Sequence, residues 1–543
     1  MPVQVAAVLL LLVALCGGVR AQDTGTDASM VVERYIQHYV VEPDGSYTVT
    51  VDNAKRIQQP RAVQAHGQYY ISYNKTLDEV LSIEAYTHKP DGRRVPVAAD
   101  QVHDQQEAAS TDAPMFQDTR LKIVVFPEVE VGDQLVLRYV VKRRTPLFPG
   151  QFEDLSSAQF YTHKQFELVY DMPSSMPLYA DAAGFVPLPA DDPPGRTRYR
   201  WRYVSGDNQR VEADSVSYLD YGKRLAVSTF ADYAAFAQAF RVRAHDKALP
   251  DDAIRRIAAD VTKGLGDTRS RVLALSDWVR RNIRYVGVYV GPGGVVPHDA
   301  PTVLRNRYGD CKDHAVLLEA LLAALGIDST AALINNGDAY RLPRTPTLGI
   351  FNHVITYVPA LDVYLDSTAE SVAAGYLPRA DLGKPALLVK TGALAATPAR
   401  QPQRNKTVST FIVRGDGRSD FKVEKNTSGA FAEPYRQAVR NTPQAEREQL
   451  VQRMLQGLGQ KGSGVFDAGK LDSTGDDYRM SFAGTSENFV NLPGPTGLST
   501  TYNFWVGLGE PVFAMAQEKE RQQDFICHAV DTEDELVLRF PKQ

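Results

Sequence analysis

The stretch that decides the fold is RYGDCKDHAVLLEALLAALGI, at residues 307–327. Apolar residues recur in it at the spacing of one helix face: Ala315, Leu318, Leu322 and Leu325. Gly326 is a suitable residue to end such a helix, and Asp310 is a favoured N-cap residue. The pattern therefore predicts a helix whose first turn contains Cys311.

Cys311 has three possible roles: a buried apolar filler, a metal ligand or a nucleophile. At a helix start, unpaired backbone N–H groups and the positive end of the helix dipole favour a thiolate. The same N–H groups would stabilise an oxyanion formed when the sulfur attacks a carbonyl. Lys312 adds positive charge beside it, although a lysine there is expected to be solvated.

A base for Cys311 is expected on a hairpin further along the chain. His353 stands in FNHVITYV, and VYLDST follows after a four-residue turn. If Val358 pairs with Val363, Asp366 lies diagonal to His353 on the same face, with backbones roughly 7–8 Å apart. The order Cys311, His353, Asp366 then offers a nucleophile, its base and a carboxylate that fixes the tautomer of the base.

These motifs together resemble the core of the bacterial transglutaminase-like superfamily, which is related in design to papain-type cysteine peptidases. LALSDWVRRNIRYVGVYVG, at residues 273–291, resembles the helix and strand that precede this core in the family. The β-rich region before it resembles an uncharacterised domain often fused ahead of such cores in exported bacterial proteins. The resemblance to the core covers roughly residues 253–378.

The resemblance implies catalytic roles for three residues: Cys311 as nucleophile, His353 as base and Asp366 as the orienting carboxylate. It leaves the second oxyanion donor open between Tyr285 and Tyr289. No cofactor is implied.

A metal site is the main alternative to a catalytic site for this cluster. Cys311 and His314 have a C-x-x-H spacing, and Asp310, Asp313 and His353 would complete a ligand set. A structural zinc site on a helix needs a second ligand pair, which the sequence lacks, so we expect no metal. Asp313 and His314 are instead expected to support the helix start or to line the cleft.

The chain of 543 residues predicts a multidomain α+β protein. Residues 22–226 alternate like strands and predict an antiparallel β-sandwich-like domain, in which residues 121–142 form a hairpin. Residues 227–388 contain the helix of Cys311 and predict the transglutaminase-like α+β domain. After a plausible linker, residues 389–543 mix strands and helices and predict a third domain.

The N-terminus predicts export. Residues 5–16 read VAAVLLLLVALC, and a signal peptide ending at Ala21 is favoured over a lipid anchor at Cys16. No later segment has the roughly 18 apolar residues of a spanning helix. We therefore expect a periplasmic or extracellular protein with no transmembrane segment in the mature chain. Cys311 and Cys527 remain after cleavage, with Cys527 expected to be a small buried hydrophobe.

The expected function is cysteine-dependent acyl transfer on a peptide or protein amide. Water as acceptor gives a peptidase or amidase, and an amine gives a transglutaminase; export favours hydrolysis of a peptide or cell-envelope amide. The alternative is a catalytically inactive module that binds protein or envelope partners. The net charge of −5 and pI near 6.1 give no argument for a nucleic-acid partner.

Overall fold

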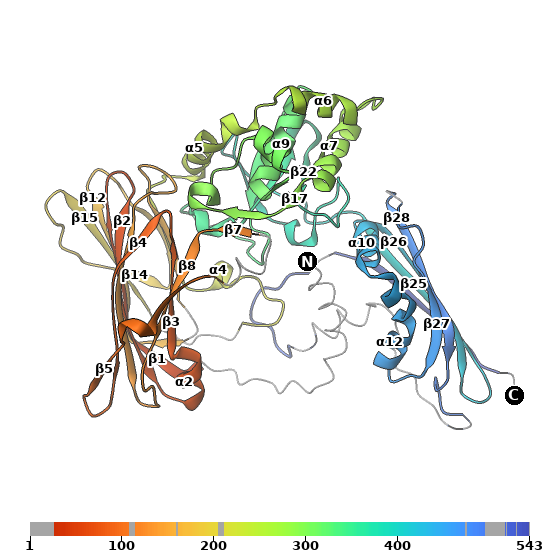
Figure 1. Cartoon of the computed structure of the whole chain (residues 1–543), viewed down its shortest axis with the longest axis horizontal. Helices are drawn as coiled ribbons and strands as arrows, with labels where there is room; N and C mark the ends of the chain where they lie inside the picture. The colour runs from red at the N-terminus through yellow and green to blue at the C-terminus, as the bar shows by residue number, and fades with distance from the viewer. Residues whose placement is uncertain are drawn as a thin grey trace.

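The computed structural model describes residues 27–107, 115–158, 161–204, 211–472, 475–492, 494, 516, 518–527 and 529–541. The predicted signal peptide and Cys16 lie outside these residues. Within them, no helix combines the length and the apolar character needed to cross a membrane. Three regions follow one another along the chain, each with its own sheet (Figure 1).

The N-terminal region is built on a nine-stranded sheet in the order β14-β15-β12-β1-β2-β9-β4-β5, with β11 beside β1. Its strands are β1 (Asp27–Val41), β2 (Tyr47–Ile57), β4 (Asp78–His88), β5 (Arg94–Pro96), β9 (Gln134–Arg143), β11 (Tyr161–His163), β12 (Phe166–Pro173), β14 (Phe185–Leu188) and β15 (Arg196–Tyr203). The β-rich prediction is confirmed. The sheet is mixed, however, because β1 runs parallel to both β11 and β12.

Two three-stranded sheets accompany it, β3-β8-β6 and β10-β16-β13. Their bounds are β3 (Gln68–Asn74), β6 (Val102–Gln106), β8 (Thr119–Val125), β10 (Glu153–Ser157), β13 (Tyr179–Ala183) and β16 (Arg224–Ser228), and helix α2 spans Pro60–His66. The predicted hairpin of β8 with β9 is wrong, because β8 pairs with β3 and β6 while β9 pairs with β2 and β4. Val124 and Leu137 instead belong to one apolar cluster contributed by both sheets.

The central region contains an antiparallel sheet in the order β22-β21-β20-β23-β24. Its strands are β20 (Thr330–Ile334), β21 (His353–Val358), β22 (Val363–Leu365), β23 (Pro385–Leu388) and β24 (Leu394–Ala396). The helices are α4 (Tyr218–Tyr221), α5 (Tyr233–Ala244), α6 (Asp252–Val261), α7 (Thr268–Asn282), α8 (Ala300–Asn306) and α9 (Cys311–Ala323). Helix α9 packs on β20 and β21, and α6, α7 and α8 pack on α9.

Short parallel strand pairs frame the start of α9. β17 (Arg284–Tyr285) pairs with β19 (Tyr308–Gly309), directly before the helix. β18 (Gly287–Tyr289) pairs with β7 (Met115–Gln117), which comes from the N-terminal region. The N-terminal region therefore contributes a strand beside the segment that leads to Cys311 (Figure 1).

The central sheet extends past the predicted domain end at Leu388, because β24 pairs with β23. At the other boundary, β16 continues to Ser228 and pairs with strands on the N-terminal side. The predicted linker, residues 392–406, thus contains strand β24 of the central sheet and the start of β25.

The C-terminal region is a five-stranded sheet, β27-β28-β26-β25-β29, with helices α10, α11 and α12. Figure 1 shows α10 and α12 on one face of it. The bounds are β25 (Gln403–Val413), β26 (Ser419–Gly429), α10 (Ala432–Asn441), α11 (Gln444–Glu448), α12 (Leu450–Gly457), β27 (Gly462–Asp467), β28 (Asp477–Ser486) and β29 (Asp531–Arg539). Helices α11 and α12 follow Pro443, and Leu450 and Leu455 of α12 are buried.

A segment before β29 contacts the stretch between β15 and α4. The carboxylate of Glu212 accepts the backbone N–H groups of Gln522 and Gln523, at 2.8 and 3.2 Å. Cys527 follows in this segment as a free, exposed thiol. Its predicted burial is wrong, because its side chain is exposed in a segment that lies on the surface.

Candidate active site

Asp310 caps helix α9, as the sequence predicts. Its Oδ1 accepts the N–H groups of Lys312 and Asp313 at 3.2 and 3.3 Å, and Oδ2 of Asp313 accepts the N–H of Asp310 at 3.2 Å. This reciprocal capping box places Cys311 at the first position of the helix. Because the cap occupies those two N–H groups, the expectation that they bind an oxyanion is not supported.

Lys312 is buried, with 5% of its surface exposed, and its ammonium pairs with Oδ2 of Asp310. The expectation of a solvated lysine is therefore wrong. Burial alone would lower the pKa of Lys312, but the charges of Asp310 and of a Cys311 thiolate outweigh burial and raise it. The raised pKa keeps Lys312 protonated next to Asp310, in the first turn of the helix that begins at Cys311.

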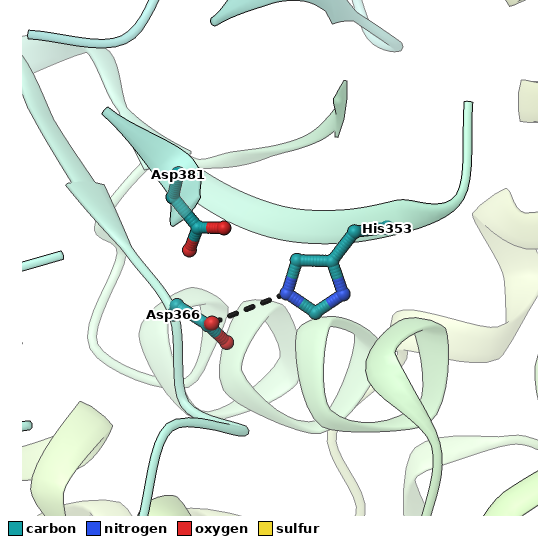
Figure 2. A group of neighbouring side chains, drawn as sticks. All are labelled: His353, Asp366 and Asp381. Atoms are coloured by element: carbon teal, nitrogen blue, oxygen red, sulfur yellow. Dashed lines mark hydrogen bonds and ion pairs between the residues drawn. The ribbon is translucent and has the colours of Figure 1, made fainter. Parts of the chain in front are cut away.

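His353 and Asp366 meet on the predicted hairpin. Val358 pairs with Val363, which is the predicted register. His353 begins β21 and Asp366 directly follows β22, and Nε2 of His353 lies 3.1 Å from Oδ2 of Asp366. Both side chains are buried, and Figure 2 shows the second ring nitrogen of His353 directed away from the carboxylate.

The charges of this pair support each other. Burial opposes the imidazolium, but the charge and hydrogen bond of Asp366, followed by the hydrogen bond and charge of Cys311, hold the pKa of His353 well above its ordinary value. Burial likewise opposes the Asp366 carboxylate, but the charge and hydrogen bond of His353 hold the pKa of Asp366 below its ordinary value. The pair is an imidazolium–carboxylate ion pair, and Cys311 interacts with the same imidazole.

Two further contacts hold Asp366 in place. Its Oδ1 accepts the backbone N–H and the hydroxyl of Thr368 at 2.9 and 2.7 Å. His314, buried on α9, donates from Nδ1 to the carbonyl of Ser367 at 3.0 Å. Burial lowers the pKa of His314, which keeps its ring neutral. His314 thus ties the helix of Cys311 to the segment that bears Asp366.

Sequence reasoning missed Asp381, which lies at the end of the 3-10 turn η6 (Arg379–Asp381). Its side chain is buried and points toward Asp366 and His353 (Figure 2). One oxygen or nitrogen atom of each of these three side chains lies within 4.8 Å of the other two. No motif marks this aspartate in the sequence, and only the folding of η6 over the hairpin brings it there.

The five residues that the sequence offers as an alternative metal site do not form a group spaced for a metal ion among the described residues. Asp313 instead accepts the backbone N–H of His298 at 2.8 Å and lies 3.1 Å from its Nδ1. Nδ1 of His314 is taken by Ser367, as described above. Across the described ranges, the group spaced for a metal ion is His353, Asp366 and Asp381, which does not include Cys311.

Tyr285 lies in β17, with its ring centroid 6.1 Å from that of His314. The side chain of Tyr289 lies outside the described side chains. The oxyanion role of either tyrosine stays a prediction.

Comparisons with known proteins agree with this architecture. Residues 43–205 match a domain of unknown function, DUF3857, and residues 255–338 match the transglutaminase-like superfamily. A crystal structure from Parabacteroides distasonis, described as a candidate protease, is similar with a TM-score of 0.61 at 19% identity, covering 72% of this chain and 75% of that one. That similarity shows a shared fold.

Two other structures match with TM-scores that are too low to establish a shared fold. A candidate cysteine protease from Cytophaga hutchinsonii has a TM-score of 0.17 at 12% identity, over 60% of this chain and 76% of that one. An M1 zinc metallopeptidase from Deinococcus radiodurans has a TM-score of 0.20 at 16% identity, over 38% and 43%. No curated protein matches the chain. The matched domains confirm the resemblance found in the sequence: this chain carries a transglutaminase-like core preceded by a DUF3857 domain.

Proposed function

We propose that this chain is an exported cysteine-dependent acyl-transfer enzyme that acts on peptide or protein amide bonds. The observation that carries the proposal is His353, which bonds Asp366 through Nε2 and interacts with Cys311 at the start of α9. A helix-start thiol, an imidazole and an orienting carboxylate are the groups that thiol-based acyl transfer requires.

The reaction follows from this geometry. Nε2–H of His353 donates to Asp366, and Nδ1 holds the proton that the Cys311 thiol has given up, so the site rests as a thiolate beside an imidazolium. The sulfur attacks the amide carbon, and the carbonyl oxygen becomes an oxyanion. The C–N bond then breaks, the amine leaves with the proton from His353, and a thioester remains. Water or a second amine attacks the thioester, His353 takes its proton, and Cys311 leaves as the thiolate.

Hydrolysis is the favoured outcome. The apolar N-terminal stretch supports export, and an exported enzyme meets peptides and cell-envelope amides as substrates. The candidate protease from Parabacteroides distasonis has a similar fold, which is compatible with a peptide substrate. Incorporation of a fluorescent amine into a protein substrate, measured beside release of free carboxylate, distinguishes transamidation from hydrolysis.

The test is the rate of Cys311 alkylation by iodoacetamide against pH, followed by peptide mass spectrometry. Cys527 is free and exposed, so its alkylation in the same molecule is the internal reference. We expect Cys311 to react rapidly near pH 6, where Cys527 reacts slowly, and His353→Ala to abolish this advantage. A Cys311 that reacts only above about pH 8, regardless of His353, would overturn the enzyme and favour the inactive binding module.

A further inference from the structure

We infer that Asp381 is a positioning residue of this site: a neutral carboxyl group whose O–H donates a hydrogen bond to the Asp366 carboxylate and holds it against His353. This inference rests on the proposed function, because the pair that it positions is the proposed base and its orienter.

The geometry leaves one place for such a donor. A carboxylate offers about four lone-pair sites. The backbone and hydroxyl of Thr368 take two sites on Oδ1 of Asp366, and Nε2 of His353 takes one on Oδ2. An oxygen of Asp381 lies within 4.8 Å of ligand atoms of both Asp366 and His353. Its O–H completes the set.

Two carboxyl groups this close in a buried site cannot both ionise without a large repulsion. Asp381 is 1% exposed, and no described donor reaches its Oδ2. Burial is the main cause that raises the pKa of Asp381 to about 8, and the charge of Asp366 adds to it. The proton therefore resides on Asp381 at neutral pH, while Asp366 keeps the charge that His353 needs.

Two positively charged groups, His353 and Lys384, also act on Asp381. His353 and Lys384 lower its pKa, without cancelling the effects of burial and Asp366. Lys384 is fully buried in the same region, and its ammonium donates to the carbonyls of Gly337 and Ala339. His314 is neutral. Burial lowers the pKa of Lys384 to about 8, so both Asp381 and Lys384 change charge just above neutral pH, and Lys384 is retained in every Asp381 variant.

Ionisation of Asp381 has a defined consequence. A second negative charge beside Asp366 holds the proton on His353 more firmly, so the imidazolium survives to higher pH than it would beside a neutral group. An amide at this position keeps a hydrogen-bond donor but never ionises. Asp381→Asn therefore removes the ionisation and keeps the hydrogen-bond donor, whereas Asp381→Ala removes both the ionisation and the donor.

The experiment measures Cys311 alkylation by iodoacetate and by iodoacetamide from pH 5 to pH 10. The ratio of the two rates reports the imidazolium, because that cation attracts the anionic reagent only. We expect Asp381→Ala to slow both reactions about tenfold near pH 6, as loss of a hydrogen bond to a charged group implies. Asp381→Asn is expected to stay within about threefold there. Its rate ratio is expected to fall at lower pH than in the wild type.

The matched control is Asp78→Asn, which replaces another buried aspartate that accepts a backbone N–H, in the N-terminal region. It is expected to leave the rate ratio unchanged. Thermal unfolding of every variant checks that it folds. The pH at which the ratio of iodoacetate to iodoacetamide rates falls in Asp381→Asn does not depend on a modest loss of stability.

The inference is overturned if Asp381→Asn keeps the wild-type pH profile, or if Asp381→Ala reacts like the wild type. One equivalent of tightly bound transition metal in the purified protein, lost in Asp381→Asn, would overturn it as well. Alkylation that depends on His353 and Asp366 but not on Asp381 removes this inference alone. Alkylation that is independent of His353 removes the proposed function too.

Discussion

Nε2 of His353 donates to Oδ2 of Asp366 across 3.1 Å, and both groups are buried. This bond commits Nε2 of His353 to Asp366, so Nδ1 is the nitrogen that remains for Cys311. Burial also means that the ion pair is barely screened by solvent. The pKa values of these two residues therefore depend on each other.

Asp366→Asn is expected to slow alkylation of Cys311 near pH 6 by at least about tenfold, because the amide cannot support the imidazolium that pairs with the thiolate. Alkylation of Cys527 in the same sample is the internal control. Equal rates for Cys311 in Asp366→Asn and the wild type would show that Asp366 does not assist the site.

The free energy of unfolding is expected to depend on pH through His353. A group whose pKa is raised in the folded state stabilises fully below its unfolded value, about 6.5, and loses that contribution as pH rises through the folded value. The lowered pKa of Asp366 acts oppositely: its contribution is present above about 3.8 and is lost as pH falls toward the folded value.

The measurement is urea unfolding at pH 6 and pH 9 for the wild type and His353→Gln. The wild type is expected to lose about 1–3 kcal/mol more than the variant over this interval. The raised pKa of Asp381 also makes stability fall with pH, but Asp381 is present in both proteins. Parallel losses in the two proteins would contradict the assignment to His353.

Asp310→Asn is expected to destabilise the protein by about 3–5 kcal/mol, since it leaves the buried Lys312 ammonium without its counter-charge. Asp232→Asn is the matched control, because Asp232 caps α5 through the N–H of Ala235 and is exposed. The control is expected to lose less than about 1 kcal/mol. Chemical denaturation of both variants tests this difference, and equal small losses would show that Lys312 finds another partner.

Leu318→Ala is expected to cost about 2–5 kcal/mol, because Leu318 is fully buried where α9 packs on the neighbouring helices. Val242→Ala, at a position 70% exposed on α5, is expected to stay within about 0.5 kcal/mol. Urea unfolding measures both. A loss below about 1 kcal/mol at Leu318 would mean that the core collapses around the missing side chain.

Some sequence predictions failed for a common reason. The apolar strands β8 and β9 read as a hairpin, yet they face each other from two sheets, because alternation reports which side is buried and not which strand is the neighbour. Lys312 was expected in solvent, and its burial depends on the position of Asp310 and on the packing around the helix start. Local patterns do not contain either fact.

The sequence by itself determined the helix start at Cys311 and the hairpin of His353 and Asp366. These depend on short-range rules, namely an N-cap, an apolar period and a four-residue turn that leaves few registers. The tertiary structure alone decided the closeness of Asp381 and the ion pair at the helix start. Asp381 is brought to the site by packing of a distant segment, and burial raises its pKa. Packing also buries Lys312, whose ammonium is kept charged by Asp310 against the effect of burial, and no single stretch of sequence specifies that burial.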